Sequence, residues 1–284
     1  MEIFKSVVLG IIQGLTEFFP VSSSGHLVIF PYFFKWQEPS IYFTVTLHFA
    51  TLAALLTVLY RDAWLIIKNF FLGLFIKKYR EDSGFKLALH IIIASIPAAV
   101  IGYLFNDFIE TFFSKPIFSA AFLILTAAIL ILFEFIGKKN ESKYSSITGQ
   151  DKKINYLTAL IIGISQAVAI FPGISRSGST ISSARIFGVK REDAVRFSFL
   201  ISIPVIFGSF VFEMAKGFKN SGIKISHDNI ALIAVIAGFI FAYLSGLFAV
   251  KFLLKFSIKR NLNIFAVYCV ILSIIFFVVY FIRK

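Results

Sequence analysis

The feature that most constrains the fold is a series of long apolar runs, each long enough to cross a lipid bilayer. About six of them stand out, at residues 41–60, 86–105, 116–137, 194–214, 229–250 and 264–282. A hydrocarbon layer of about 30 Å needs roughly 20 apolar residues in a helix. Because lipid offers no partner for a free backbone N–H or C=O group, such runs are expected to be helical. The sequence therefore predicts an all-α, polytopic membrane protein with about six full transmembrane helices.

Composition agrees with a membrane protein, in which a high positive charge does not indicate nucleic-acid binding. The chain is 58% hydrophobic and only 15% charged, whereas soluble domains are about 25% charged. A net charge of +13 in a soluble protein would suggest nucleic acid. Here the basic residues gather in short loops, the pattern expected on the cytoplasmic side of a membrane. We therefore expect no nucleic-acid partner, and we assign to the cytoplasm loops 77–86, 138–153, 190–196 and 251–260.

Two further apolar stretches are interrupted by polar residues. Stretch 4–34 is broken by "PVSSSGH", and stretch 156–188 is broken by "FPGISRSGST". A shift of the chain against itself by 153 positions, without a gap, aligns both breaks on a shared S-x-S-G pattern. The matched pairs are Gly10 and Gly163, Gln13 and Gln166, Ser22 and Ser175, Ser24 and Ser177, and Gly25 and Gly178. The match indicates an internal repeat.

The number of spans predicts how the two repeats are oriented. Residues 1–137 would hold one re-entrant hairpin (4–34) and three spans, and residues 156–284 would hold a second hairpin (156–188) and three spans. A polar linker, 138–155, would join them. Three is odd, so the second half must be inverted, and inverted repeats place a site where their interrupted helices meet. Segment 62–76 contains Lys68 and is expected to be an interfacial helix, with a short tilted span as the alternative.

The second break has the composition of an anion site. Arg176 lies among hydroxyls and glycines, just before an expected helix. A loop that leads into a helix N-terminus binds anions through its free N–H groups, and arginine adds a planar fork suited to phosphate. The alternative is a serine–glycine turn whose arginine reaches the membrane surface, but an arginine within a broken span is usually functional.

The first break offers acid–base and nucleophilic groups. Gln13 and Glu17 are four residues apart and therefore share one helix face. Glu17 could bind a divalent metal or act as a base, and the serines at 22–24 offer hydroxyl nucleophiles that His26 could activate. Packing for Gln13 and capping at the membrane surface for His26 are the structural alternatives. Together the two breaks predict phosphoryl transfer or hydrolysis at the membrane.

The strings "QGLTEFFPVSSSGH" and "PGISRSGSTI" strongly resemble the two signature regions of undecaprenyl-pyrophosphate phosphatases, the bacitracin-resistance family. The resemblance continues in "HFATLAALL", "SIPAAVIG" and "DAVRFSFLISIP", so it covers nearly the whole chain. The family's first motif corresponds to Gln13 and Glu17, with glutamine at its more variable position. The resemblance implies hydrolysis of undecaprenyl diphosphate in the bacterial inner membrane, at a site reached from the outer face, with Mg²⁺ or Ca²⁺ as cofactor.

The resemblance also implies roles for single residues. We expect Arg176 to hold the diphosphate, Glu17 to bind metal or polarise the nucleophile, Ser23 to attack, and His26 to act as acid or base. Direct attack by His26, giving a phosphohistidine, remains an alternative. Substrate binding is expected from Ser22, Ser24, Gly173, Ser175, Ser177 and Thr180, and metal binding from Glu17 and Gln13. A homodimer is left open.

Two questions remain open at this point. Broken helices in inverted repeats are also the architecture of transporters, so a transporter or flippase of a polyprenyl phosphate or another anionic lipid is the alternative function. A transporter would need Arg176 and the helix ends, but not a nucleophile and a base. His48, in the middle of the first span, could approach the polar centre or form a simple hydrogen bond between helices.

Overall fold

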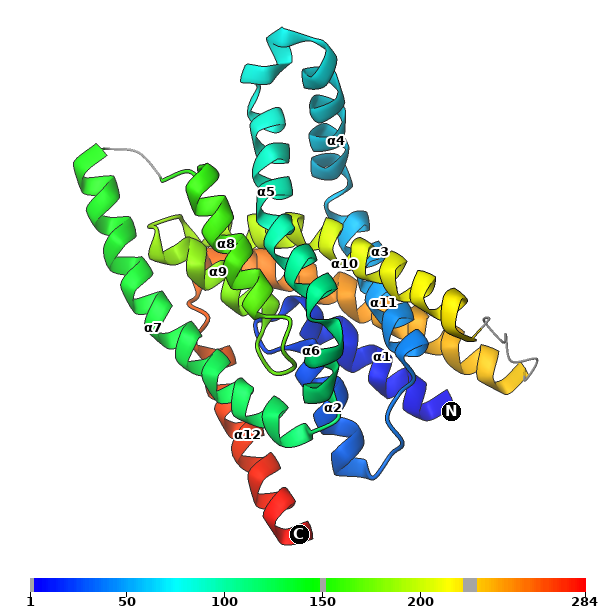
Figure 1. Cartoon of the computed structure of the whole chain (residues 1–284). Coiled ribbons are helices and arrows are strands. Elements are labelled where there is room, and N and C mark those ends of the chain that lie inside the picture. Colours follow the sequence, from blue (N-terminus) through cyan, green and yellow to red (C-terminus); the bar gives the residue numbers. More distant parts are fainter. Residues whose placement is uncertain (1–2, 149–151, 222–228) are drawn as a thin grey trace.

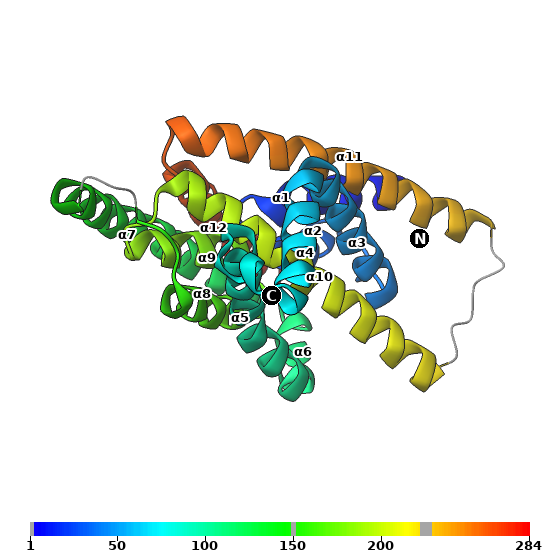
Figure 2. The same ribbon diagram turned by 90° about the horizontal axis from the view of Figure 1, so that it is seen from above.

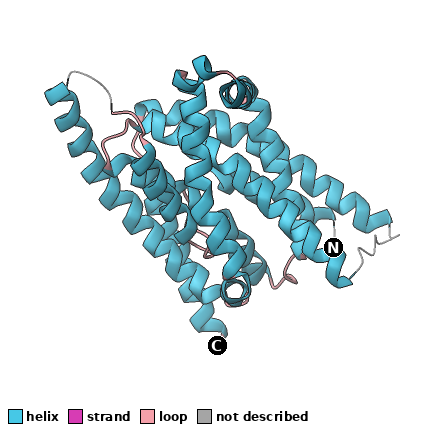
Figure 3. Ribbon diagram, turned by 45° about the horizontal axis from the view of Figure 1, so that its top comes forward, coloured by secondary structure: helices cyan, strands magenta, loops and turns pink. Residues whose placement is uncertain are grey.

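The computed structural model describes residues 3–148, 152–221 and 229–284, and in these ranges the chain is all-helical, without a strand (Figures 1 and 3). This agrees with the predicted fold class. The helices are α1 (Ile3–Phe18), α2 (Ser23–Phe34), α3 (Ile41–Val58), α4 (Tyr60–Phe75), α5 (Ser83–Leu104), α6 (Asn106–Phe113), α7 (Pro116–Thr148), α8 (Tyr156–Val168), α9 (Arg176–Ile186), α10 (Arg191–Ser221), α11 (Asn229–Lys259) and α12 (Asn263–Arg283); a 3₁₀ turn, Lys77–Glu81, joins α4 to α5.

Six helices are long and apolar enough to cross a membrane, and they coincide with the six predicted spans. They are α3, α5, α7, α10, α11 and α12. Helix α4 is not among them; it pairs with α5 and projects from the rest of the molecule at the top of Figure 1. The protein is therefore a multi-pass membrane protein.

The predicted linker 138–155 is only partly a linker. Helix α7 continues to Thr148, so most of the predicted linker is a helical extension of the third span. Residues 149–151 lie outside the described residues. A run of charged and polar residues that includes lysine and glutamate is compatible with a helix once it leaves the membrane, because both have good helix propensity. Polarity alone therefore did not mark the end of the helix.

The two broken stretches each form a pair of short helices, α1 with α2 and α8 with α9. Helix α1 packs along α11 (Figure 2), and α8 packs along α5. A glycine makes each approach close: a Cβ atom on Gly10 would lie 2.4 Å from the carbonyl oxygen of Gly238, and one on Gly163 would lie 2.6 Å from that of Ala94. Gly10 and Gly163 are partners under the shift of 153. These matched contacts favour the predicted repeat, whose inverted orientation stays a prediction.

Helix α9 is polar and yet almost wholly buried, so its position depends on hydrogen bonds. An unpaired buried polar group is costly, and each helix that surrounds α9 supplies partners for it. Ser183 bonds Ser165 of α8 at 2.9 Å, and Thr180 bonds Ser198 of α10 at 2.6 Å. Arg185, 1% exposed, pairs with Glu141 of the α7 extension. Helix α9 is thereby fixed between α7, α8 and α10.

Candidate active site

Each pair of short helices is joined by a short connection: residues 19–22 between α1 and α2 (the first tip) and residues 169–175 between α8 and α9 (the second tip). The two tips meet at the centre of the molecule. Ser22 caps α2 by accepting a hydrogen bond from Gly25 N at 3.3 Å, and Ser175 caps α9 by accepting one from Gly178 N at 3.0 Å. Ser22 Oγ also accepts a hydrogen bond from Gly173 N at 3.0 Å, which links one tip to the other. The two N-caps therefore match in sequence and in their cap hydrogen bond, although Ser22 has φ 67° and Ser175 has φ −74°. The first of them also joins the two pairs.

Thr126, a residue that the sequence analysis did not single out, holds the second tip in place. Thr126 of α7 donates its hydroxyl to Gly173 O at 2.8 Å and accepts from Ser175 N at 3.0 Å. Gly173 has φ +100°, and a Cβ there would lie 2.2 Å from Ser119 O, so only glycine fits. Thr126 sits in an apolar run with no local sequence signal. Only the fold shows that it fixes the tip.

Glu17 is the centre of a polar cluster that also contains Gln13, Ser23, His48 and Arg176. Its Oε1 accepts a hydrogen bond from Arg176 Nη2 at 2.8 Å, and its Oε2 accepts from Gln13 Nε2 at 2.8 Å and from Ser23 Oγ at 2.7 Å. His48 Nε2 lies 3.6 Å from the same Oε2. The structure thus brings the predicted acid, the predicted hydroxyl and the predicted arginine together, although Glu17 and Arg176 are 159 residues apart.

His48 belongs to this cluster. Its Nδ1 lies 2.8 Å from Thr44 O. A carbonyl oxygen can only accept, so Nδ1 carries a proton and Nε2 is the atom that faces Glu17. The side chain is 28% exposed to a cavity that Glu17 also lines. The structure therefore decides between the two roles considered for His48: it lies in the site.

A cavity of about 710 Å³ opens above the cluster, between α3, α5, α6 and α10. At its polar end lie Glu17, Ser23, Ser24, His48 and Arg176, whereas most of its remaining wall is apolar. Apolar walls with a few convergent polar groups are typical of a site for an amphipathic ligand. The cavity suits a molecule with a long hydrocarbon tail and a small anionic head.

His26 lies outside the lining of this cavity. Its side chain is 1% exposed, its Nδ1 donates to Ser22 O at 2.7 Å, and its Nε2 lies 2.7 Å from the hydroxyl of Tyr268 in α12. The two rings are stacked, with an interplanar angle of 8°. Both nitrogens are therefore engaged behind the first tip. The predicted acid–base role of His26 stays a prediction, and the geometry favours a role in positioning the loop of Ser22.

The remaining predicted residues lie around the tips. Ser24 and Ser175 line the cavity, while Ser177 donates to Phe19 O at 3.0 Å and Thr180 bonds Arg176 O at 2.9 Å. Gly173 and Ser22 form the link between the tips. The buried hydroxyls of Ser177 and Thr180 therefore support the loop, and the groups that can touch a ligand are nearer Arg176.

Glu17 and Gln13 were predicted to bind metal. Among the described residues no group of three or more histidine, cysteine or carboxylate side chains forms a metal cluster. Glu17 is the one carboxylate in the polar cluster, with Gln13 behind it, and the Oε1 atom of Gln13 is buried without a hydrogen-bond partner. A single carboxylate suits Mg²⁺, which protein carboxylates commonly share with substrate phosphates. The residues fit a cation that Glu17 and a diphosphate would hold together.

Comparison with known proteins agrees with this arrangement. The family model for bacitracin resistance protein BacA matches residues 6–275. The chain is 43% identical to an undecaprenyl-diphosphatase of Thermosipho africanus, over 96% of this chain and 98% of the relative. It is 39% identical to one of Methanococcus vannielii, over 98% of this chain and 100% of the relative, and 36% identical to one of Moorella thermoacetica over the full length of both. The chain belongs to the bacitracin resistance protein BacA family.

Proposed function

We propose that this protein hydrolyses undecaprenyl diphosphate to undecaprenyl phosphate and inorganic phosphate. The main support is the cluster in which Ser23, Glu17 and Arg176 meet at the polar end of a long apolar cavity. An attacking hydroxyl, a base and an anion-binding arginine are the parts that phosphate hydrolysis requires. A transporter or flippase would not need the hydrogen bond between Ser23 and Glu17, so that alternative is not favoured.

Arg176 and the N-terminus of α9 would bind the diphosphate. The Arg176 side chain is 16% exposed, enough for its remaining donors to reach a ligand in the cavity. The first N–H groups of α9 add the positive end of the helix dipole. The hydrocarbon chain would lie along the apolar wall between α3, α5 and α10.

Ser23 would attack the terminal phosphorus. Its hydroxyl already donates to Glu17 Oε2 at 2.7 Å, so the carboxylate can accept the proton as the new P–O bond forms and the anhydride bond breaks. Undecaprenyl phosphate leaves as an anion, and a phosphate with a second pKa near 6 needs little help from an acid. The result is a phosphoserine, free lipid phosphate and a protonated Glu17.

Water would then hydrolyse the phosphoserine. With Nδ1 bonded to Thr44 O, Nε2 of neutral His48 would take a proton from the attacking water and then pass it to the released phosphate or to water. Glu17 returns its proton to the departing Ser23 oxygen, which restores the hydroxyl and releases inorganic phosphate. Attack by His26 would first have to break its hydrogen bond to Tyr268.

A divalent cation, Mg²⁺ or Ca²⁺, would neutralise charge on the diphosphate. Phosphate oxygens would hold it, with Glu17 as a protein ligand while that carboxylate is ionised. We place the site in the cytoplasmic membrane of the cell, open to the outer side, because the four basic loops lie on the opposite face under the positive-inside rule. The product would be the lipid carrier of cell-wall sugars in its reusable form, which accounts for bacitracin resistance.

The experiment measures inorganic phosphate released from a C55 or C15 prenyl diphosphate by purified protein in detergent, with Mg²⁺, Ca²⁺ or a chelator. We expect metal-dependent release that is lost in Glu17→Ala and Arg176→Ala. Folded wild-type protein that releases no phosphate from either substrate would refute the proposed activity. A lipid-transport assay would then be the next step.

A further inference from the structure

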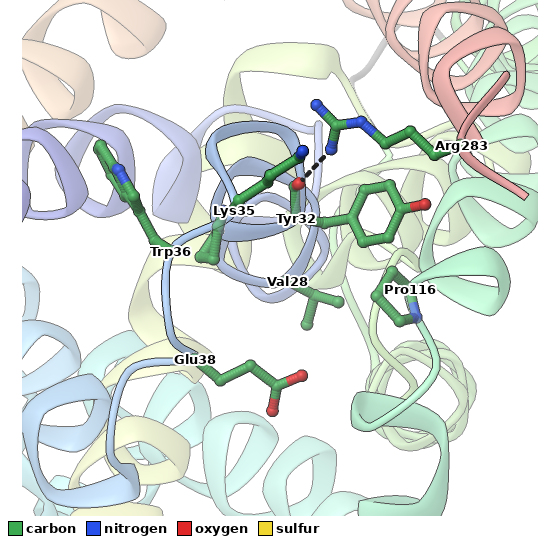
Figure 4. Close-up of a pocket in the computed structure, with 8 residues that line it drawn as sticks. Val28, Tyr32, Lys35, Trp36, Glu38, Pro116 and Arg283 are labelled. Carbon is green, nitrogen blue, oxygen red and sulfur yellow. Dashed lines mark hydrogen bonds between the residues drawn. The ribbon is translucent and has the colours of Figure 1, made fainter.

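A second pocket lies where α2 ends and adjoins the cavity. It has a volume of about 600 Å³, and it shares Val28 and Glu38 with the wall of the cavity (Figure 4). The rest of its lining is basic and aromatic: Tyr32, Lys35, Trp36 and Arg283, with two prolines. Neither break in the sequence contributes to it, and the proposed reaction does not use it.

Arg283 is held rigidly in this pocket. Its Nη1 donates to Tyr32 O at 2.7 Å and its Nη2 to Phe33 O at 2.9 Å, and its guanidinium lies 5.5 Å from the centre of the Tyr32 ring. The last carbonyl groups of a helix attract cations, so α2 fixes the guanidinium in place. Arginine has five N–H donors, and these two bonds leave donors free for a ligand.

Lys35 brings a second cation to the same point. Its backbone adopts a left-handed conformation, with φ 52°, and its N–H donates to Tyr32 O, the oxygen that also accepts from Arg283. In Figure 4 the side chains of Lys35 and Arg283 point toward one another. Among the described residues Lys35 Nζ has neither a hydrogen-bond nor an ion-pair partner. A left-handed lysine is uncommon, and here it directs an unpaired cation into a pocket.

We propose that this pocket binds a phosphate group, with Lys35 and Arg283 as its donors. Neither Lys35 nor Arg283 forms an ion pair among the described residues, although the carboxylate of Glu38 also lines the pocket, and a shared phosphate would accept hydrogen bonds from both cations. Trp36 and Tyr32 are residues that prefer the interface between membrane and water. Two sources have this chemistry: inorganic phosphate that leaves the neighbouring cavity, and the headgroup of a membrane lipid.

The test measures binding rather than turnover, so it is independent of the proposed activity. The protein carries Glu17→Gln and Arg176→Ala, which remove the anion site of the catalytic cavity. In a phosphate-free detergent it is titrated with inorganic phosphate or with a short-chain phosphatidylglycerol, and broadening of the ³¹P NMR signal reports binding. Circular dichroism verifies that each variant is folded. Lys35→Glu is the test variant, Lys35→Arg is the conservative control, and Lys68→Glu is a matched control that changes the same charge on exposed α4.

We expect Lys35→Glu to weaken binding at least tenfold, while Lys35→Arg and Lys68→Glu bind as the parent does. Loss of inorganic phosphate binding would identify the released product as the ligand. Loss of lipid binding alone would identify the headgroup. If neither probe binds in a manner that depends on Lys35, the pocket is not a phosphate site and the inference is wrong.

Discussion

The ion pair between Arg176 and Glu17 allows a quantitative prediction about stability. The Glu17 side chain is 4% exposed, whereas that of Arg176 is 16% exposed. Arg176→Ala therefore leaves a buried carboxylate without its cation, and loss of one partner of a buried pair costs about 3–5 kcal/mol. Glu17→Gln leaves the more exposed partner and keeps an acceptor in place, so its cost should be smaller, about 1–2 kcal/mol.

The double variant, Glu17→Gln with Arg176→Ala, has no charge left to bury, so it should be close to Glu17→Gln alone. One kcal/mol corresponds to about 2–4 °C in unfolding temperature for a large domain, so Arg176→Ala should lower the temperature by roughly 6–20 °C. Tryptophan fluorescence during heating in detergent measures all four proteins. Two results would each refute the reasoning: an Arg176→Ala protein within about 2 °C of wild type, or a double variant less stable than Arg176→Ala.

Three further predictions concern the supports of the site. Thr126→Val leaves two buried backbone groups of the second tip unpaired, so we expect the free energy of unfolding to fall by about 1–3 kcal/mol and kcat to decrease. Thr126→Ser keeps the hydroxyl and should avoid both effects. Equal kcat in the two variants would contradict the role of Thr126 in positioning the tip. Tyr268→Phe removes the partner of His26 Nε2, and we expect about 1 kcal/mol of destabilisation with kcat changed less than tenfold in phosphate-release assays. Gly163→Ala places a Cβ 2.6 Å from a carbonyl of α5 and should lower the unfolding temperature, whereas at Gly208, where a Cβ would meet nothing within 4 Å, alanine should raise it slightly.

The spans and the two tips were predictable because their signals are local. Long apolar runs mark α3, α5, α7, α10, α11 and α12, and the S-x-S-G pattern marks both N-caps. The contact between Glu17 and Arg176 followed from chemistry, since each break lacked what the other supplied. The end of α7 at Thr148 was missed because charged residues can continue a helix in water.

The supporting residues were not predictable in the same way. In a membrane helix, apolar residues face lipid as well as the core, so hydropathy does not show which face points inward. His48, Thr126 and Tyr268 lie in such helices. Only the packing shows that His48 faces the cavity, that Thr126 fixes the second tip, and that Tyr268 engages His26, 242 residues away in the sequence.

The central claim is that Ser23, activated by Glu17, attacks the diphosphate, and the chain contains a matched control for it. Ser23 and Ser24 are neighbours, both are partly buried, and both line the cavity, but the structure shows only Ser23 bonded to Glu17. The measurement is kcat for phosphate release from a prenyl diphosphate by Ser23→Ala and by Ser24→Ala. We expect a loss of roughly 10³-fold or more for Ser23→Ala, typical of a removed nucleophile, and less than tenfold for Ser24→Ala. Comparable activity in the two variants would contradict the account.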